Sequence, residues 1–214
     1  MAFDLPVFGS NVAPLQEYLL QGSFLDSQRE VIIHRIMGIC DVTDARIESF
    51  HFKDHEMVFI MKGSPGTQPI YLRVRRSLEH PDNPWHLRYI GNPDIGDKSR
   101  HTLVRSCVDV STSENVVTFL EELGFKIDHE FMADGYMFRK GRMKVIISKI
   151  YKNNQPGNLK EQLEPISHSH LLELSIVAAQ GQDKIQDDMK NFAEQLKPLV
   201  QLEKIDHKRL LSMP

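Results

Sequence analysis

Cysteine is scarce in this chain of 214 residues, which holds only Cys40 and Cys107 and contains no C-x-x-C motif. Intracellular proteins rarely keep disulfides, so we expect two free, buried thiols in a reducing compartment, with a disulfide as the less favoured alternative. The first residues lack the charged start and apolar core of a secretory leader. No apolar run approaches the roughly 18 residues that span a bilayer, so we expect neither an integral membrane protein nor a membrane partner.

An excess of charge is also missing. The chain has 26 basic and 29 acidic residues, a net charge of −3. This balance gives no global attraction to nucleic acid or anionic lipid, so any such contact must come from a local patch. The contents of 41% hydrophobic and 26% charged residues are those of an ordinary globular protein and exclude a wholly disordered or fibrous one.

The motifs of common catalytic sites are absent as well. The stretches GSPG and GNPDIGDK lack the context of phosphate-binding loops and are interpreted as turns. There is no G-x-S-x-G nucleophile turn, and Cys107 falls in the middle of an expected strand. His168 and His170 would lie about 6.6 Å apart on one strand face, but no cysteine or acidic cluster joins them. We therefore expect no catalytic residue, no metal site and no cofactor.

What the sequence does contain is a series of short alternating segments with three helices. Alternation indicates strands at residues 15–21, 56–63, 71–76, 86–91, 101–110 and 170–179, and an antiparallel meander over 125–151. In the meander, tight reversals are expected at Asp134-Gly135 and Lys140-Gly141. Loops are expected over 41–56 and 152–168, and a flexible tail over 1–13.

The three expected helices have recognisable ends. The first begins at Ser27, which forms a capping box with Glu30, and carries an apolar stripe of Val31, Ile32, Ile36 and Met37. The second begins at Ser111 or Ser113 and ends at Gly124, and the third is stopped near Pro198. The third carries an apolar stripe of Ile185, Met189, Phe192 and Leu196.

Regularly spaced strands with few helices favour a closed or strongly curled antiparallel sheet. No internal repeat, low-complexity tract or Pro/Gly linker divides the sequence. The expected fold class is therefore α+β, mainly antiparallel β, in one domain over residues 1–214.

The segment YLRVRR, residues 71–76, places two arginines on one face of a strand. Arg73 and Arg75 point the same way, and the next two strands repeat the alternation with Arg88 and Arg105. These four arginines could wall a barrel lumen and bind phosphate through bidentate hydrogen bonds, or they could face a partner, nucleic acid or water.

Six segments, spread almost end to end, resemble the animal members of the Mediator subunit 18 family: EYLLQGS, DHEMVF, PWHLRYIG, GDKSRHTLVRSCVD, SENVVTFLEELGF and DDMKNFAEQLKPLV. The resemblance implies a multistranded β-barrel related to triphosphate tunnel enzymes. It implies a non-enzymatic subunit of the Mediator head module, acting in the nucleus as a coactivator of RNA polymerase II. The implied partners are Mediator subunit 20, the C-terminal helix of subunit 8, and other head subunits and polymerase machinery, with no direct contact to nucleic acid.

Tunnel enzymes carry E-x-E-x-K on the first strand and a further pair of glutamates on a late strand, which together hold a catalytic metal. Our alignment places Glu17, Leu19 and Gln21 at the first-strand positions and leaves only Glu173 on the late strand. Two acids are too few to fix a metal, so the resemblance implies a degenerate site. The alternatives are a metal-dependent tripolyphosphatase or nucleoside triphosphatase that uses Glu17 and Glu173, and nucleic-acid binding through the arginines.

Overall fold

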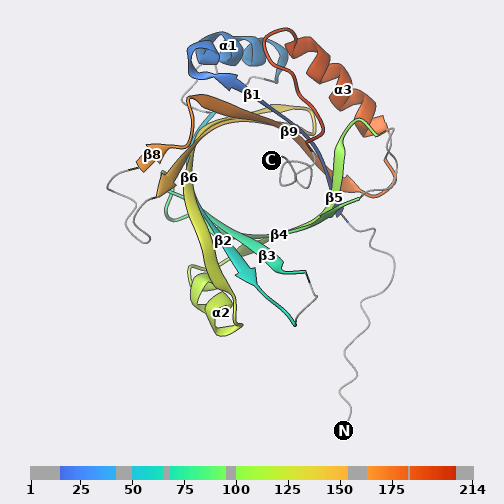
Figure 1. Cartoon of the computed structure of the whole chain (residues 1–214). Helices are drawn as coiled ribbons and strands as arrows, with labels where there is room; N and C mark the ends of the chain where they lie inside the picture. The colour runs from blue at the N-terminus through green and yellow to red at the C-terminus, as the bar shows by residue number, and fades with distance from the viewer. Residues whose placement is uncertain are drawn as a thin grey trace, which may run out of the picture.

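The computed structural model describes residues 15–41, 50–64, 68–94, 100–153, 163–182 and 184–205. Its strands form one antiparallel sheet in the order β6-β2-β3-β4-β5-β1-β9-β7-β8, and β6 also pairs with β7 (Figure 1). That extra pairing closes all strands except β8 into a barrel. The strands are β1 (Leu15–Leu25), β2 (His51–Met61), β3 (Ile70–Ser77), β4 (Trp85–Pro93), β5 (Leu103–Thr112), β6 (Lys126–Lys140), β7 (Met143–Asn153), β8 (Leu163–Pro165) and β9 (Ser169–Ala179).

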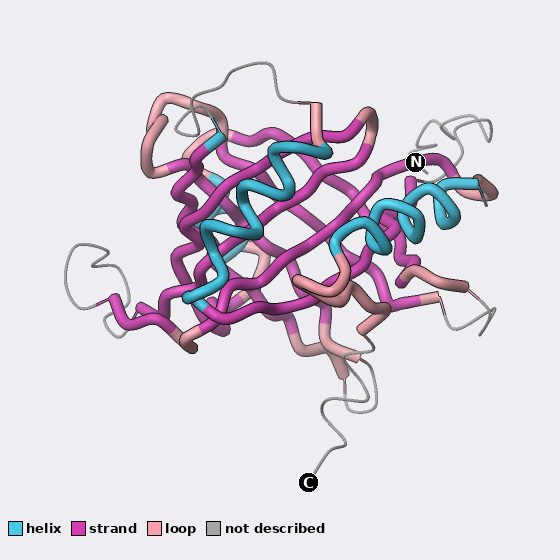
Figure 2. The backbone as a smooth tube through the Cα atoms, turned by 90° about the horizontal axis from the view of Figure 1, so that it is seen from above, coloured by secondary structure: helices cyan, strands magenta, loops and turns pink. Residues whose placement is uncertain are grey.

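Three α-helices lie outside the barrel wall: α1 (Arg29–Ile39), α2 (Val116–Glu122) and α3 (Lys184–Leu196). A 3-10 turn, η1 (Asp26–Gln28), leads into α1. Helices α1 and α3 lie on the side of β1 and β9, as the view from above shows, and α2 lies on the opposite side (Figures 1 and 2). No helix within the described ranges is long and apolar enough to cross a membrane.

The apolar core lies between the wall and its helices. Alternate side chains of a strand point to opposite faces, so Tyr18 and Leu20 of β1 face outward while Glu17 and Leu19 face the lumen. The larger core joins β1, β7 and β9 to α1 and α3, and its fully buried members include Ile32, Ile36, Phe138, Val145, Ile147, Leu172, Leu174, Met189 and Leu196. A smaller core under α2 contains Met57, Phe59, Val74, Val116, Leu120 and Phe125.

The closed antiparallel barrel and the three helices confirm the expected fold class. The expected loop over 41–56 is wrong from His51 onward, because β2 begins there and pairs with β6. The interval 152–168 contains the end of β7 and the short β8. The remainder of these two loops (42–49 and 154–162) and the expected tail lie outside the described residues.

The expected starts of two helices are also wrong. Ser27 lies in the 3-10 turn, the N-cap of α1 is Gln28, and no side chain caps it. The second helix begins at Val116, because Ser111 continues β5. Val31 does not belong to the buried stripe, being 57% exposed. The expected ends of the second and third helices are confirmed. Gly124, which has φ +96, lies just after α2, and Pro198 follows α3.

The reversal expected at Asp134-Gly135 does not exist, because β6 runs unbroken through both residues. Gly135 pairs with Phe52 of β2 and Ser148 of β7. A Cβ atom at this position would lie 1.9 Å from the carbonyl oxygen of Ile147. The glycine thus permits close strand approach, the second common role of glycine in strands. The reversal at Lys140-Gly141 is confirmed as the β6–β7 turn, where Gly141 has φ +55.

We expect Gly135→Ala to lower the free energy of unfolding by about 1–3 kcal/mol, because the added methyl group must displace the β7 backbone. Gly38→Ala in α1 is the matched control, since no atom beyond the adjacent backbone of its own helix lies within 4 Å of its added Cβ. That change should be neutral or stabilising by up to about 1 kcal/mol. Urea unfolding measures both, and equal effects of the two substitutions would contradict the close-approach explanation.

Candidate functional site

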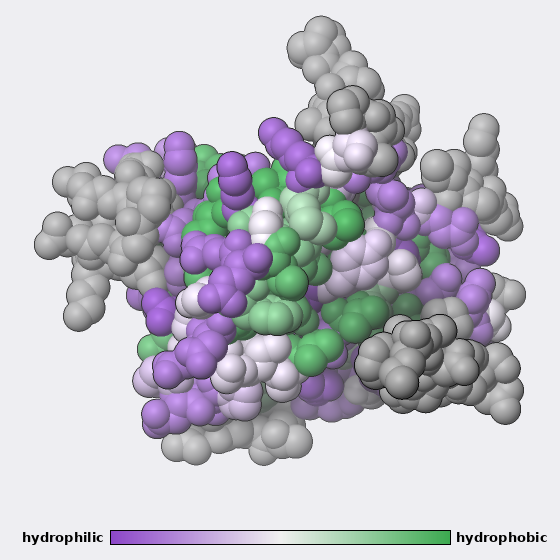
Figure 3. Space-filling view, turned by 90° about the horizontal axis from the view of Figure 1, so that it is seen from below, coloured by the Kyte–Doolittle hydropathy of each residue, from purple (hydrophilic) through white to green (hydrophobic). Residues whose placement is uncertain are grey.

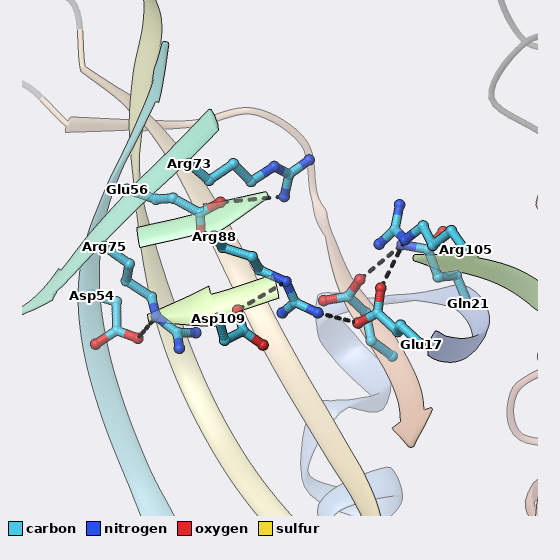
Figure 4. Close-up of polar contacts among 10 residues, drawn as sticks. Glu17, Gln21, Asp54, Glu56, Arg73, Arg75, Arg88, Arg105 and Asp109 are labelled. Atoms are coloured by element: carbon cyan, nitrogen blue, oxygen red, sulfur yellow. Dashed lines mark hydrogen bonds and ion pairs between the residues drawn. The ribbon is translucent and has the colours of Figure 1, made fainter. Parts of the chain in front are cut away.

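The lumen of the barrel holds the candidate site. A cavity of about 350 Å³ is lined by inward side chains of β1–β5, β7 and β9. A neighbouring cavity of about 310 Å³ shares with it Arg75, His86, Lys144 and Ile146. The lining is rich in charge, and Figure 4 shows arginines and carboxylates from different strands pointing toward one another.

All four arginines singled out in the sequence line the larger cavity: Arg73, Arg75, Arg88 and Arg105. Register explains their proximity, since Arg73 lies directly opposite Arg88 across β3 and β4. The opposite faces of β3 and β4 contribute Val74 and Leu87 to the core under α2. The structure thus brings these arginines together in the lumen, and their binding of a ligand there stays a prediction.

Glu17 forms the centre of the best-formed ion-pair group. Arg88 Nη2 donates to its Oε1 at 2.5 Å, and Arg105 Nε donates to its Oε2 at 2.7 Å. Arg88 Nε also lies 3.4 Å from an oxygen of Asp109. Because Glu17 is only 4% exposed, the two guanidinium groups replace most of the water that would otherwise solvate this carboxylate.

The other two arginines have looser partners. Arg73 Nη1 lies 3.2 Å from Glu56, and Arg75 Nε lies 3.7 Å from Asp54 (Figure 4). Burial raises the pKa of Asp54, and the positive charge of Arg75 opposes that rise. Asp54 therefore lies farther from Arg75, at 3.7 Å, than Glu17 lies from Arg88 and Arg105, at 2.5 and 2.7 Å.

The remaining positions compared with tunnel enzymes also face the lumen. Leu19 and Glu173 line the larger cavity, and Gln21 lies directly opposite Glu173. Gln21 Nε2 donates to Glu173 Oε1 at 2.8 Å. Burial raises the pKa of Glu173, against the lowering effect of that hydrogen bond, and the charge of Glu17 raises it further. Both glutamates are thus held by donors of the protein itself.

No group of three or more His, Cys, Asp or Glu side chains suited to a metal ion occurs in the described ranges. His168 and His170, which the sequence offered as a possible metal-binding pair, lie in different environments. His170 begins the buried part of β9, stacks on Phe24 and lies 3.0 Å from Asp26, whereas His168 is exposed in the preceding bend.

Both cysteines are free, as expected. Cys107 is buried, and burial raises its pKa. Cys40 is only half-buried, so the expectation of burial is wrong there, although desolvation still raises its pKa to about 11. At neutral pH both thiols stay protonated and are poor nucleophiles.

Sequence reasoning missed two cations of the lumen, Arg139 and Lys144. They lie directly opposite each other on β6 and β7 and line the smaller cavity. Burial, together with the charges of Arg75, Arg88 and Arg139, lowers the pKa of Lys144 to about 8, and the charge of Asp54 opposes this fall. The sequence did contain a signal for these two cations, since they flank the correctly expected turn at Lys140-Gly141. Alternation alone, however, cannot say which face of a strand points into the lumen.

Comparison with known proteins gives a family match over most of the chain. Residues 16–211 match the sequence profile of a family described as Med18 protein. A protein of Danio rerio named Mediator of RNA polymerase II transcription subunit 18 is 54% identical over 207 residues, covering 97% of this chain and 96% of the relative.

Two solved structures share the barrel. A chain of the Schizosaccharomyces pombe Mediator head module matches with a TM-score of 0.70 and 16% identity, covering 89% of this chain and 98% of that one. The PH1819 protein of Pyrococcus horikoshii matches with a TM-score of 0.55 and 16% identity, covering 91% and 97%. At such identities the two structures show a common fold.

We expect Glu17→Gln to lower the free energy of unfolding by about 2–4 kcal/mol, because it leaves Arg88 and Arg105 without their shared counter-charge in a buried place. Glu194→Gln is the matched control, since it makes the same change in an exposed ion pair with Lys197 and should cost less than about 1 kcal/mol. Chemical unfolding at pH 7 compares them. A loss for Glu17→Gln no larger than for the control would refute the central role of this carboxylate.

Lys144→Met should stabilise the protein at pH 7 in phosphate-free buffer, by on the order of 1–3 kcal/mol. Lys144 has a pKa of about 8 in the folded state against an ordinary value of 10.5, so the folded state holds this proton less tightly. Its destabilising effect is fully present below pH 8 and is relieved as the pH rises toward 10.5. Unfolding measured at pH 7, 9 and 10.5 should therefore show the advantage of Lys144→Met shrinking, and a pH-independent difference would contradict this origin.

Proposed function

The chain belongs to the Med18 protein family, and on this basis we propose that it is a non-enzymatic subunit of the Mediator head module. In this role it acts in the nucleus, as part of the coactivator through which regulatory signals reach RNA polymerase II. The observation that carries the proposal is the 54% identity, over almost the full length of both chains, to a protein named as this subunit. The function is then to bind other subunits.

The chemistry of the lumen supports a role without catalysis. A divalent metal would need carboxylate oxygens that are free to coordinate it. Both oxygens of Glu17 accept hydrogen bonds from arginines, Glu173 accepts one from Gln21, and Leu19 offers no ligand. These features oppose the tripolyphosphatase alternative. The arginines also point into the barrel toward carboxylates, an arrangement that opposes nucleic-acid binding along an outer surface.

We further propose that the chain forms a heterodimer with Mediator subunit 20 and docks on the C-terminal helix of subunit 8. A surface suited to the first contact is the outer face of β4 and β5. Val108 and Val110 are 54% and 47% exposed there, and they lie directly opposite Tyr89 and Leu87. We call this surface, with the exposed Phe119 of the neighbouring α2 and Leu123 just after that helix, the bare face.

Within the described part of the chain, the helices leave Val108 and Val110 of the bare face exposed, although Leu87 packs against the core under α2. Helices α1 and α3 cover β1 and β9, whereas α2 packs Val116 and Leu120 over the core of β2 and β3 (Figure 1). Apolar side chains gather in the view of the molecule from below, the side that carries α2 (Figure 3). Contiguous apolar surface of this kind marks interaction sites, and a gently twisted sheet face fits the face of a second sheet.

Co-expression with subunit 20 and the C-terminal segment of subunit 8 tests both parts of this proposal. Size-exclusion chromatography with light scattering should give one 1:1:1 complex for the native chain. Val108→Lys places a charge in the bare face and should weaken the binding of subunit 20 at least tenfold.

Val31→Lys is the matched control, because Val31 is 57% exposed on α1, across the barrel from the bare face. This variant should assemble like the native chain. A native chain that remains monomeric beside both partners would overturn the partner proposal. Full assembly of the Val108→Lys variant would instead overturn the assignment of the bare face.

A further inference from the structure

One end of the lumen carries more positive than negative charge. Arg75, Arg139 and Lys144 line the smaller cavity, together with His86, and Asp54 is the only carboxylate among the described residues that line it. Three basic side chains therefore share one acid within this cavity, while Glu56, the cross-strand partner of Arg75, lines the larger cavity. This imbalance differs from the other end, where Glu17 and Asp109 compensate their arginines.

The positions of these cations make the repulsion local. Arg139 and Lys144 are direct cross-strand partners, an arrangement in which like charges destabilise a sheet. Neither side chain has a hydrogen bond or ion pair with any residue that the structure describes. Arg75 is shared with the larger cavity and reaches Asp54 only at 3.7 Å. The fold thus brings three cations into one space in which Asp54, 3.7 Å from Arg75, is the one carboxylate among the described lining residues.

The geometry points to a binding site for a compact phosphoryl group at this end of the lumen, held by Lys144, Arg139 and Arg75. Guanidinium groups donate two parallel hydrogen bonds to a phosphate, and an ammonium group adds a point charge with three donors. The cavity of about 310 Å³ leaves room for such a group. Burial first, and then the charges of Arg75, Arg88 and Arg139, lower the pKa of Lys144, and a bound dianion would offset the repulsion from these three arginines.

This site differs from a metal-dependent tunnel site in its residues and its needs. It uses cations of β3, β6 and β7, whereas the positions compared with tunnel enzymes lie on β1 and β9. It requires no metal, because the protein supplies the positive charge. The phosphoryl group could come from free phosphate or diphosphate, or from the end of a nucleotide. The inference does not depend on assembly with other Mediator subunits.

Calorimetric titration of the full chain at pH 7 and constant ionic strength tests the site, with inorganic phosphate, pyrophosphate and metal-free ATP as separate probes. We expect saturable 1:1 binding of at least one probe. Lys144→Met and Arg139→Gln should each weaken it at least tenfold. Lys126→Met, which removes an exposed charge from the start of β6, should leave it unchanged.

The probes separate the sources of the phosphoryl group. Binding of phosphate or pyrophosphate that depends on Lys144 supports a site for the free anion, and binding of ATP alone with the same dependence supports a nucleotide. Loss of binding in Lys144→Met cannot be attributed to unfolding, because that variant is expected to be at least as stable as the native chain. The inference is overturned if no probe saturates, or if Lys144→Met and Lys126→Met bind equally well.

Discussion

The pairing of β6 with β7 is the constraint on which the rest of the structure depends. It joins the ends of the sheet, so every strand of the barrel has one face toward the lumen and one toward the outside. β6 can make this closure because it is long, and because Gly135 lets it approach β7 closely in the middle of their pairing. Once the sheet is closed, alternation along each strand divides charged from apolar side chains.

The two faces then meet different demands. Inside, charges that lose water need partners, and Glu17 meets this demand for Arg88 and Arg105 from two neighbouring strands. Around Lys144 the cations are not fully balanced by acids, because closure places cations of β3, β6 and β7 together. Outside, apolar residues need cover, which α1 and α3 give to β1 and β9 but which β4 and β5 largely lack. The excess of cations inside the barrel suggests a bound anion, and the uncovered apolar residues outside it suggest a protein partner.

Much of this architecture could be predicted from sequence, because local patterns fix strand faces. Alternation placed Arg73 and Arg75 opposite Val74 correctly, and glycine placed the end of α2 and the β6–β7 turn. The reversal expected at Asp134-Gly135 was wrong because glycine is favoured both in tight turns and where two strands approach closely. The capping pattern at Ser27 misled because η1 precedes α1. Arg139 lies just across the β6–β7 turn from Lys144, but Arg75 and Arg88 come from strands far away in sequence, so the depressed pKa of Lys144 could not be predicted locally.

The central claim is that barrel closure leaves the outer face of β4 and β5 available for a partner while the opposite side is occupied by the chain's own helices. Hydrogen–deuterium exchange of the chain alone and in complex with Mediator subunit 20 tests it most directly. We expect the complex to show slower exchange in peptides covering α2 and strands β4 and β5, with exchange in α1 and α3 unchanged. Protection confined to α1 and α3 would contradict it.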